Sequence, residues 1–387
     1  MIRFENNPQP KMLILYASYG EGHLQVARAI KGALEERGNY RTVMVDLMAE
    51  SHPWLNEVTR RFYLKSYTHM PSLYGWMYDF TRQMKHDSLF GGLLHSFGRD
   101  KIRRIIAIEQ PDIVVHTFPS FALPELKRRK DYHPPSYAVI TDFDLHRRWV
   151  HPSIDRYYVA TEDLKLELTH LGIPDSDIQV SGIPLKRGFR ASAATSELYE
   201  RYKLRSDQPV VLIMAGAQGV MPDVPQICSG LLNDDKVQVA LVCGHNLLMK
   251  DTIEKQFQAH KGASRLHVYG FIEQIHELMA LSDCLITKPG GVTLSEAIAA
   301  ELPIFIYRPV PGQEKQNALY LESKGAAIIA NEANELTEQI LKLIHDPLRL
   351  TISKLCIKQL QSSQTAADSI ILDILSNLRI MEKASTL

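Results

Sequence analysis

The sequence is poor in cysteine, carries no net charge and lacks long apolar runs. Its four cysteines, at positions 228, 243, 284 and 356 of 387 residues, show no CxxC spacing. This pattern suits a reducing cytoplasm and argues against both a disulfide framework and a zinc site. Lysine plus arginine and aspartate plus glutamate each number 44, which makes the formal charge zero. We therefore do not expect a nucleic-acid-binding protein held by a global basic field.

Hydrophobic targeting segments are also missing. The first residues, MIRFENNPQPK, contain no apolar stretch of the kind found in a secretory signal, so we expect no leader. No window holds the roughly 18 uninterrupted apolar residues that a membrane-spanning helix needs. Neither absence argues against attachment to a membrane surface.

The sequence does contain a regular alternation of short apolar runs and helical segments. Helical spacing is seen in runs such as 24–34 and 164–171. The expected strands are 12–17, 42–46, 112–116, 136–140 and 156–159. This alternation predicts an α/β fold in which a parallel sheet carries helices on both faces.

A polar stretch at 186–208 interrupts the alternation, and a second series follows it. Its expected strands are 210–215, 237–242, 266–269, 284–287 and 303–307. Because 387 residues exceed what one core usually holds, two domains are predicted. We assign residues 1–195 to the first domain and 196–365 to the second, and expect the helical end, 366–387, to pack back onto the first.

The first candidate site follows the first expected strand, where ligands bind in parallel sheets. Ser18-Tyr19-Gly20-Glu21-Gly22-His23 combines glycines that permit a tight turn with a helix start that favours anions. Asp46 would suit a ribose, but Gln25 occupies the third glycine position of a dinucleotide loop, which disfavours NAD. We prefer a functional His23, which titrates near neutral pH, over a glycine-rich turn with an incidental histidine.

The second candidate site runs from Lys288 to Glu296, directly after the strand at 284–287. Gly290 and Gly291 at a helix start expose backbone N–H groups to a phosphate, and Thr293 adds a further donor. Glu296, about one turn into the helix, is suited to accept from ribose hydroxyls. The structural alternative is a capping box, with Thr293 as the cap and Glu296 reaching back.

A third candidate site follows the strand at 303–307. The segment VPGQEKQN presents Gln313, Glu314 and Asn317 near the start of the next helix. Clustered amides and a carboxylate suit a polyhydroxylated ligand such as a sugar. An ordinary polar helix start is the alternative.

The fourth candidate site is the segment after the strand at 136–140. It contains Asp142, Asp144, His146, Trp149 and His151. Its carboxylates and histidines suit acid–base chemistry or binding of an acceptor. A metal site is disfavoured because the aspartates and histidines of this segment do not have the spacing of a recognised metal-binding motif. A solvated polar loop is the structural alternative.

Aromatic and basic residues are interleaved between positions 54 and 107. Examples are Trp54, Arg60, Arg61, Tyr74 and Trp76. This mixture suits contact with the interface of a membrane that contains anionic lipids. A buried aromatic core with a solvated basic rim is an equally weighted alternative.

Together these motifs resemble one family. Five motifs occur in the same order as in that family: YGEGH, TDF followed by H, W and H, VSGIP, KPGGVTLSEA and PVPGQEKQNA. They are similar to motifs of the two-domain glycosyltransferases of the monogalactosyldiacylglycerol synthase and MurG group. The likeness is strongest to the processive diacylglycerol β-glucosyltransferases of Gram-positive bacteria, and it covers residues 10–370.

The resemblance implies a GT-B fold, in which two Rossmann-like domains face a central cleft. The C-terminal domain would hold the sugar nucleotide and the N-terminal domain the acceptor. The implied reaction is an inverting transfer of a hexose, glucose in the first instance, from UDP-hexose to 1,2-diacylglycerol, with processive addition of sugars. The enzyme would act as a peripheral protein on the cytoplasmic face of the cell membrane and contact anionic lipids. The residues predict no oligomeric state.

The resemblance also implies roles for the donor residues. Those expected to contact the UDP-sugar are Gly290, Gly291 and Thr293 at the diphosphate, Glu296 at the ribose, the Phe271 backbone at the uracil, and Gln313, Glu314 and Asn317 at the sugar. Lys288 would assist the leaving group. Gly216 and Gly219 are also expected to take part in donor binding. Their loop departs from the glycine run of MurG-type enzymes, so its individual phosphate contacts are not assigned.

The acceptor side is expected to include Gly22, His146, Trp149 and His151. His23 is our first choice of base for the acceptor hydroxyl, and Asp142 is its rival or the partner that orients it. Because no DxD motif stands at a metal–diphosphate position, neither a metal nor another cofactor is expected. Rival functions are a UDP-GlcNAc transferase acting on a lipid-linked peptidoglycan precursor, a sugar-nucleotide epimerase and a non-catalytic UDP-sugar sensor.

Overall fold

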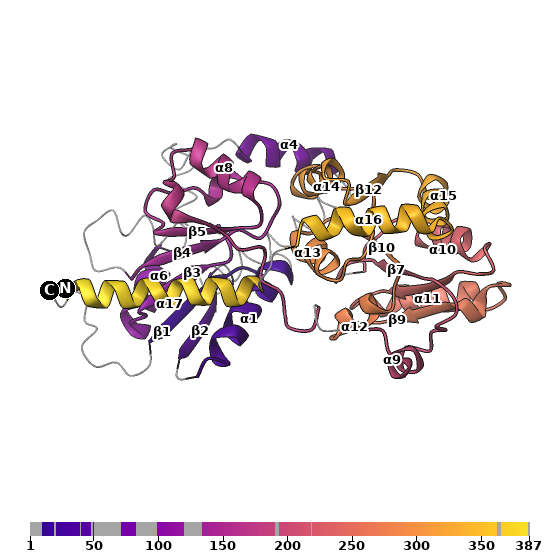
Figure 1. Ribbon diagram of the computed structural model, residues 1–387, viewed down its shortest axis with the longest axis horizontal. Helices are drawn as coiled ribbons and strands as arrows, with labels where there is room; N and C mark the ends of the chain where they lie inside the picture. The colour runs from indigo at the N-terminus through magenta and orange to yellow at the C-terminus, as the bar shows by residue number, and fades with distance from the viewer. Residues whose placement is uncertain are drawn as a thin grey trace. The chain divides into compact units, whose positions relative to one another are not determined.

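The computed structural model of the chain contains two compact units (Figure 1). It describes residues 10–18, 21–38, 40–47, 49, 71–82, 99–119, 134–189, 193–217, 219–361 and 365–385. Unit 1 comprises Met1–Lys186, Pro311–Gln313 and Ser362–Leu387, and unit 2 comprises Arg187–Val310 and Glu314–Gln361. The first segment of unit 1 thus ends at Lys186, whereas the sequence places the domain boundary at 195.

A parallel sheet of six strands forms the centre of unit 1, in the order β2-β1-β3-β4-β5-β6. The strands are β1 (Lys11–Tyr16), β2 (Arg41–Asp46), β3 (Ile113–His116), β4 (Ser136–Val139), β5 (Arg156–Val159) and β6 (Ile178–Val180). Leu13 of β1 is in register with Val43 of β2 on one side and Val114 of β3 on the other. The side chains of β3 and β4 are buried throughout, as expected for inner strands of a parallel sheet.

Helices pack beside this sheet. They are α1 (Glu21–Glu35), α4 (Pro71–Arg82), α6 (Arg99–Glu109), α8 (Glu162–His170) and α17 (Ala366–Ser385), with short 3₁₀ turns at Arg147–Trp149 and Asp175–Asp177. Helix α1 buries Val26, Ile30, Ala33 and other apolar residues at the three- and four-residue spacing of one helical face. Thr161 caps α8 by accepting a hydrogen bond from the backbone N–H of Leu164.

Unit 2 has a second parallel sheet of six strands, in the order β12-β11-β10-β7-β8-β9. The strands are β7 (Val210–Met214), β8 (Gln238–Val242), β9 (Leu266–Tyr269), β10 (Cys284–Thr287), β11 (Ile304–Tyr307) and β12 (Ala327–Ala330). The helices are α9 (Ser196–Arg201), α10 (Val224–Leu232), α11 (Leu247–Phe257), α12 (Ile275–Ala280), α13 (Gly291–Ala299), α14 (Gln313–Ser323), α15 (Ala333–Ile344) and α16 (Pro347–Gln359), with a 3₁₀ turn at Ala263–Arg265. The predicted α/β class with parallel sheets is confirmed in both units. The two strands that the sequence did not predict, β6 and β12, both lie at a sheet edge.

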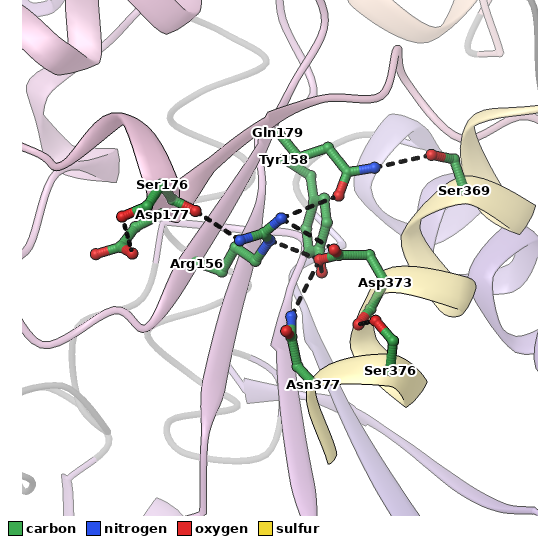
Figure 2. A network of polar contacts seen from close by, with 9 residues as sticks. All are labelled: Arg156, Tyr158, Ser176, Asp177, Gln179, Ser369, Asp373, Ser376 and Asn377. Carbon is green, nitrogen blue, oxygen red and sulfur yellow. Dashed lines mark hydrogen bonds and ion pairs between the residues drawn. The ribbon is translucent and has the colours of Figure 1, made fainter. Parts of the chain in front are cut away.

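The C-terminal helix α17 belongs to unit 1, where it packs against α1. Figure 2 shows the polar contacts that join it to the edge of the sheet. Asp373 of α17 accepts a hydrogen bond from the Tyr158 hydroxyl at 2.7 Å and forms an ion pair with Arg156, whose Nε lies 2.5 Å from Oδ2. A second ion pair joins Asp368 to Arg37 at 2.9 Å. A chain segment distant in sequence thus becomes part of the first unit. None of the helices within the described residues combines the length and apolar character needed to cross a bilayer.

The Asp373 contacts predict a measurable stability change. Replacement Asp373→Ala leaves the partly buried Arg156 guanidinium and Tyr158 hydroxyl without their shared acceptor, and should lower the free energy of unfolding of unit 1 by about 2 kcal/mol. Urea unfolding followed by circular dichroism measures the change. Asp207→Ala, which removes an exposed ion pair with Arg205, is the control and should shift the unfolding midpoint very little. Equal midpoints for the two variants would contradict the prediction.

Candidate active site

His23 lies where three neighbouring strands of unit 1 end. It is the third residue of α1, which begins soon after β1. Thr117, after β3, donates from Oγ1 to the His23 carbonyl oxygen at 3.1 Å, and Thr141, after β4, places Oγ1 3.3 Å from His23 Nδ1. Phe118 packs its ring edge-on against the imidazole at a centroid distance of 5.3 Å. The parallel direction of the strands brings these side chains together at one edge of the sheet.

The surroundings of His23 control its protonation. Burial disfavours the imidazolium ion and lowers the pKa of His23 to about 4, although the contact with Thr117 acts in the opposite direction. The ring is therefore neutral near pH 7 and has a lone pair to accept a proton. If Nδ1–H donates to Thr141 Oγ1, the free lone pair is on Nε2.

Asp46 is held by the segment that follows β1. Its Oδ2 accepts from the backbone N–H of Ser18 at 3.1 Å and from the Ser18 hydroxyl, and its Oδ1 accepts from the N–H of Ala49 at 2.9 Å. The carboxylate that a dinucleotide loop would offer to a ribose is thus engaged in local structure. Gly22 lies in the first turn of α1, while Tyr19 and Gly20 lie outside the described residues.

Hydrogen bonds and an ion pair join the segment after β4 to helix α4. Asp144 accepts from the Tyr78 hydroxyl at 3.1 Å and pairs with Arg82 at 2.6 Å. The Nε2 of His146 lies 3.3 Å from the Thr81 hydroxyl oxygen, and its ring contacts the Tyr78 ring edge-on. Burial and the nearby arginines lower the pKa of His146 to about 3, so this ring is also neutral. These contacts hold the segment in which Asp142, itself buried, follows β4.

Two of the predicted acceptor residues, Trp149 and His151, are buried. Trp149 is buried in the apolar cluster beneath β4 and β5, together with Tyr157 and Leu164. His151 is also buried: its Nδ1 accepts from the backbone N–H of Ser153, and its carbonyl oxygen accepts from the Tyr157 hydroxyl. Neither side chain reaches the surface in this structure, so the expected contact of Trp149 and His151 with an acceptor gains no support from it and stays a prediction.

Helix α4 has an exposed aromatic face. The side chains of Trp76 and Phe80 are 63% and 62% exposed, and their rings stack at a centroid distance of 5.7 Å. Such exposure in two adjacent large aromatic side chains does not fit the alternative of a buried aromatic core at this helix. The other predicted membrane residues, Trp54, Arg60 and Arg61, lie outside the described residues, as does the side chain of Tyr74.

In unit 2, the glycine loop after β7 packs against the segment after β8. The backbone N–H of His245 donates to the Ala217 carbonyl oxygen at 3.0 Å, and the Asn246 amide donates to that of Gly219 at 3.1 Å. Gly219 adopts a positive φ of 58°, and a Cβ there would lie 2.3 Å from the carbonyl oxygen of Cys243. The close approach of two backbones explains this glycine. Gly216 has a φ of 80°, but a Cβ added there would meet no atom within 4 Å.

An aromatic pair lies at the ends of β8 and β9. The His245 and Phe271 rings stack almost in parallel, with centroids 4.4 Å apart and an interplanar angle of 9°. Phe271 is exposed, so the pair offers a flat surface beside a backbone segment. Of these residues only Phe271 was predicted from the sequence, and His245 and Asn246 were missed. Their signal is their place directly after a buried strand, in the short segment Gly244-His245-Asn246.

The segment after β10 leads into α13 through glycine. Gly290 is the N-cap of the helix, and Thr293 is its third residue, so the capping-box alternative with Thr293 as the cap is wrong. A glycine cap has no side chain to bond the first N–H groups, which makes them suitable donors to an anion. Glu296 is buried within the same helix. Lys288, just before the helix, is partly buried, and burial lowers its pKa although the nearby charge of Glu314 acts in the opposite direction.

One residue of α14, Asn317, holds the segment that carries Gly290 in place. Asn317 is fully buried, and its amide donates to the carbonyl oxygen of Pro289 at 3.1 Å. Glu314 accepts from the backbone N–H of Val310 at 3.3 Å, and Gln313 begins the helix. Asn317, which the resemblance placed at the donor sugar, thus has a positioning contact with the loop that carries Gly290.

Metal-binding side chains do not gather at these positions. Within the residue ranges given above, no three His, Cys, Asp or Glu side chains are grouped so that they could hold a metal ion. Asp144 and His146, which the sequence places close together, are engaged with Arg82 and Thr81.

Comparison with known families gives two matches along the chain. Residues 23–185 match the family described as monogalactosyldiacylglycerol (MGDG) synthase, and residues 197–358 match glycosyl transferases group 1. The chain is 39% identical over 358 residues to a processive diacylglycerol beta-glucosyltransferase of Bacillus cytotoxicus, with 92% of each chain covered. It is 39% identical over 383 residues to the Bacillus pumilus protein of that name, a match that covers 98% of this chain and 99% of the other.

Solved structures share the fold at low sequence identity. S. aureus MnaA in complex with UDP matches with a TM-score of 0.62 at 14% identity, over 96% of this chain and 97% of the other. MurG of Acinetobacter baumannii matches with a TM-score of 0.62 at 13% identity, over 96% of this chain and all of the other. The predicted GT-B fold is therefore confirmed.

The glycine loop of unit 2 supports a second stability prediction. Gly219→Ala should destabilise unit 2 by about 3 kcal/mol, because the new methyl group meets a backbone oxygen that cannot move freely. Gly216→Ala is the matched control: it has a similarly positive φ but free space, and should cost about 1 kcal/mol from backbone strain alone. Thermal unfolding of both variants measures the difference. A smaller loss for Gly219→Ala than for Gly216→Ala would show that the close approach is absent.

Proposed function

Because the chain belongs to the family of the processive diacylglycerol beta-glucosyltransferases, we propose that it transfers a hexose from UDP-hexose to 1,2-diacylglycerol. It is a glycosyltransferase with a GT-B fold. The product would be a β-glycosyl diacylglycerol, with glucose as the sugar and repeated addition, as the names of its relatives say of those proteins. The observation that carries the proposal is the 39% identity to a relative over nearly the full length of both chains.

We assign donor binding to unit 2. The N–H groups at the start of α13, beside Gly290 and Gly291, would face the diphosphate, where their dipoles offset negative charge. The remaining donor residues of the proposal are Gly216, Gly219, Lys288 and Thr293 near the phosphates, Glu296 at the ribose, Phe271 at the uracil, and Gln313 and Glu314 at the sugar. The stacked His245–Phe271 pair supports a nucleobase site at the end of β9, because flat ring systems bind at flat surfaces.

His23 is proposed as the general base of the transfer. Its neutral imidazole takes the proton of the acceptor hydroxyl as that oxygen forms a bond to the anomeric carbon of the hexose. The bond from this carbon to the UDP oxygen breaks, and its electron pair leaves with UDP. Attack opposite the leaving group converts an α-linked donor into a β-glycoside. Fixed N–H dipoles at the start of α13 would stabilise the charge that develops on the departing diphosphate.

Asp142 is the second candidate for the base. It is buried in the segment after β4, one residue beyond the Thr141 hydroxyl that contacts His23. In this position it would act directly on the acceptor or help to orient the His23 imidazole.

Membrane attachment at the cytoplasmic face is also part of the proposal. The acceptor is a lipid, and the stacked Trp76–Phe80 pair of α4 offers exposed aromatic area of the kind that lies at a bilayer interface. No metal or other cofactor is assigned to the reaction, since the N–H dipoles and Lys288 would meet the charge of the leaving group. A GlcNAc transferase or a UDP-sugar sensor has no comparable support: the likeness to MurG, at 13% identity, concerns the fold alone.

The base assignment predicts a kinetic separation. His23→Ala should lower kcat by about 10²- to 10⁴-fold while the affinity for UDP stays unchanged, because only proton transfer is lost. In the wild type, kcat/KM should decline only as the pH falls towards about 4, where the imidazole takes up a proton. Transfer of radiolabelled glucose to diacylglycerol in mixed micelles measures both.

Two further variants serve as controls for that experiment. Glu296→Gln should raise the KM for the donor and leave the pH profile unchanged. Asp142→Asn tests the rival base. If His23→Ala retained activity and Asp142→Asn lost it, the base would be Asp142.

A metal-independent reaction is expected. Transfer by purified protein should be the same with and without an excess of EDTA over trace metal, because N–H dipoles and Lys288 stabilise the diphosphate. The radiolabel assay measures this, and a metal-dependent nuclease treated in parallel confirms that chelation works. Loss of activity that added divalent cation restores would refute the metal-free mechanism.

A further inference from the structure

Helix α16 of unit 2 (Figure 1) has a stripe of exposed apolar side chains. Leu348, Ile352 and Leu355 are 68%, 51% and 55% exposed. Their spacing of four and three residues places them along one line of the helix, within about 60° of each other around its axis. Ile357, the buried residue of the helix, lies on the opposite side. The helix therefore has apolar residues both against the unit and towards the outside.

The charges of α16 are all of one sign. It contains Arg349, Lys354 and Lys358 and no aspartate or glutamate. At about 100° per residue, Arg349 and Lys358 lie on opposite sides of the apolar stripe. Their carboxylate neighbours, Asp346 at 3.1 Å and Glu301 at 4.0 Å, come from outside the helix. An exposed apolar line with cations on both sides is typical of helices that lie in the interface of an anionic bilayer.

A pocket of about 330 Å³ adjoins the stripe. Its apolar lining includes Phe305, Ile328, Leu343 and Ile352. Two cations also line it: Lys342, which pairs with Glu338 at 2.6 Å, and Arg349, which pairs with Asp346. Ile352 thus belongs both to the stripe and to the pocket wall. A chain of methylene groups suits such a lining, and an anionic headgroup suits the cations.

We propose that α16 and the adjoining pocket form a membrane-contact surface of unit 2, which binds bilayers that contain anionic lipid. Leu348, Ile352 and Leu355 enter the interface, Arg349 and Lys358 lie at the level of the phosphates, and the pocket receives the end of an acyl chain. The surface is separate from the aromatic face of α4 in unit 1. It deepens the membrane role proposed above and rests on that role only for the choice of a lipid partner.

Charge decides between a bilayer and a second copy of the chain. In a symmetric pair the same surface faces itself. The three cations of α16 outnumber the two carboxylates beside them, Asp346 and Glu301, so an excess of positive charge would oppose itself. Like charges in that position repel, whereas an anionic headgroup layer attracts each cation. The excess of cations over carboxylates along α16 therefore favours the lipid surface.

A fluorescent label gives the direct test. Ile352→Cys in a Cys356→Ser background places an environment-sensitive dye on the stripe, since Cys228, Cys243 and Cys284 are buried. With vesicles of phosphatidylcholine and phosphatidylglycerol, the emission should shift to the blue, and lipid-borne quenchers should reduce it. The same dye at Leu166→Cys, an exposed position in α8 of unit 1, should not respond. No shift at position 352 while the protein floats with the vesicles would overturn the proposal.

Binding measurements test the two kinds of contact separately. The triple variant L348S/I352S/L355S should bind these vesicles at least about tenfold more weakly than the wild type. The matched control I108S/L166S/L372S removes three other exposed apolar side chains, from unit 1, and should bind as the wild type does. R349Q/K358Q should weaken binding about thirtyfold, and only when anionic lipid is present. Equal binding by all variants would refute the proposal, and so would a dimeric wild type that becomes monomeric in the triple variant.

The enzymatic assay keeps this proposal distinct from the proposed function. In nonionic mixed micelles, L348S/I352S/L355S should transfer glucose at the wild-type rate, because the substitutions lie outside the residues assigned to catalysis. If the wild type transferred no sugar to diacylglycerol, the proposed function would fail, while the dye at position 352 would still decide the role of α16. Circular dichroism confirms that each variant is folded.

Discussion

The parallel direction of the strands is the constraint on which both units depend. Every strand pair in the two described sheets is parallel, so each strand end is followed by a crossover and the carboxyl ends meet at one edge. In unit 1 this brings His23, Thr117 and Thr141 together, although the first two stand 94 positions apart along the chain. In unit 2 it brings the glycine loop beside His245. The sheet topology thus brings the functional side chains together, whereas the local sequence determines only which side chains they are.

Buried polar contacts hold the loop segments at the carboxyl ends of the strands in fixed positions. A buried amide or carboxylate is costly unless it has a partner. The partner of Asn317 is the carbonyl oxygen of Pro289. Asp144 has two partners, Arg82 and Tyr78. In both cases a polar residue beside the site supports the backbone that carries another functional group. Preorganised N–H groups at Gly290 need such support, because dipoles that must first reorient stabilise developing charge poorly.

The sequence predicts the central strands and the site loops well because both have strong local signals. The inner strands are apolar runs that are largely buried, whereas the two unpredicted strands lie at sheet edges. β6 has only three residues, and β12 is partly exposed. His23 and Gly290 were found from glycine and helix-start patterns. The burial of Trp149 could not be predicted, because an aromatic residue in a polar segment has the same sequence signature whether it points outwards or into the core. Asn246 acts through Gly219, 27 residues away, and no local pattern encodes that contact.

The overall charge and hydrophobicity of the chain likewise do not predict how charged and apolar residues are arranged on α16. The chain has zero formal charge, yet α16 contains three cations and no carboxylate. Its apolar residues lie on opposite sides of the helix, so the helix has no single apolar face and its amphipathic character is not evident from periodicity. Exposure resolves this, because only the folded unit shows that Ile357 points inwards while Ile352 points outwards. A surface for lipid can thus form within a neutral protein wherever packing leaves an apolar line between like charges.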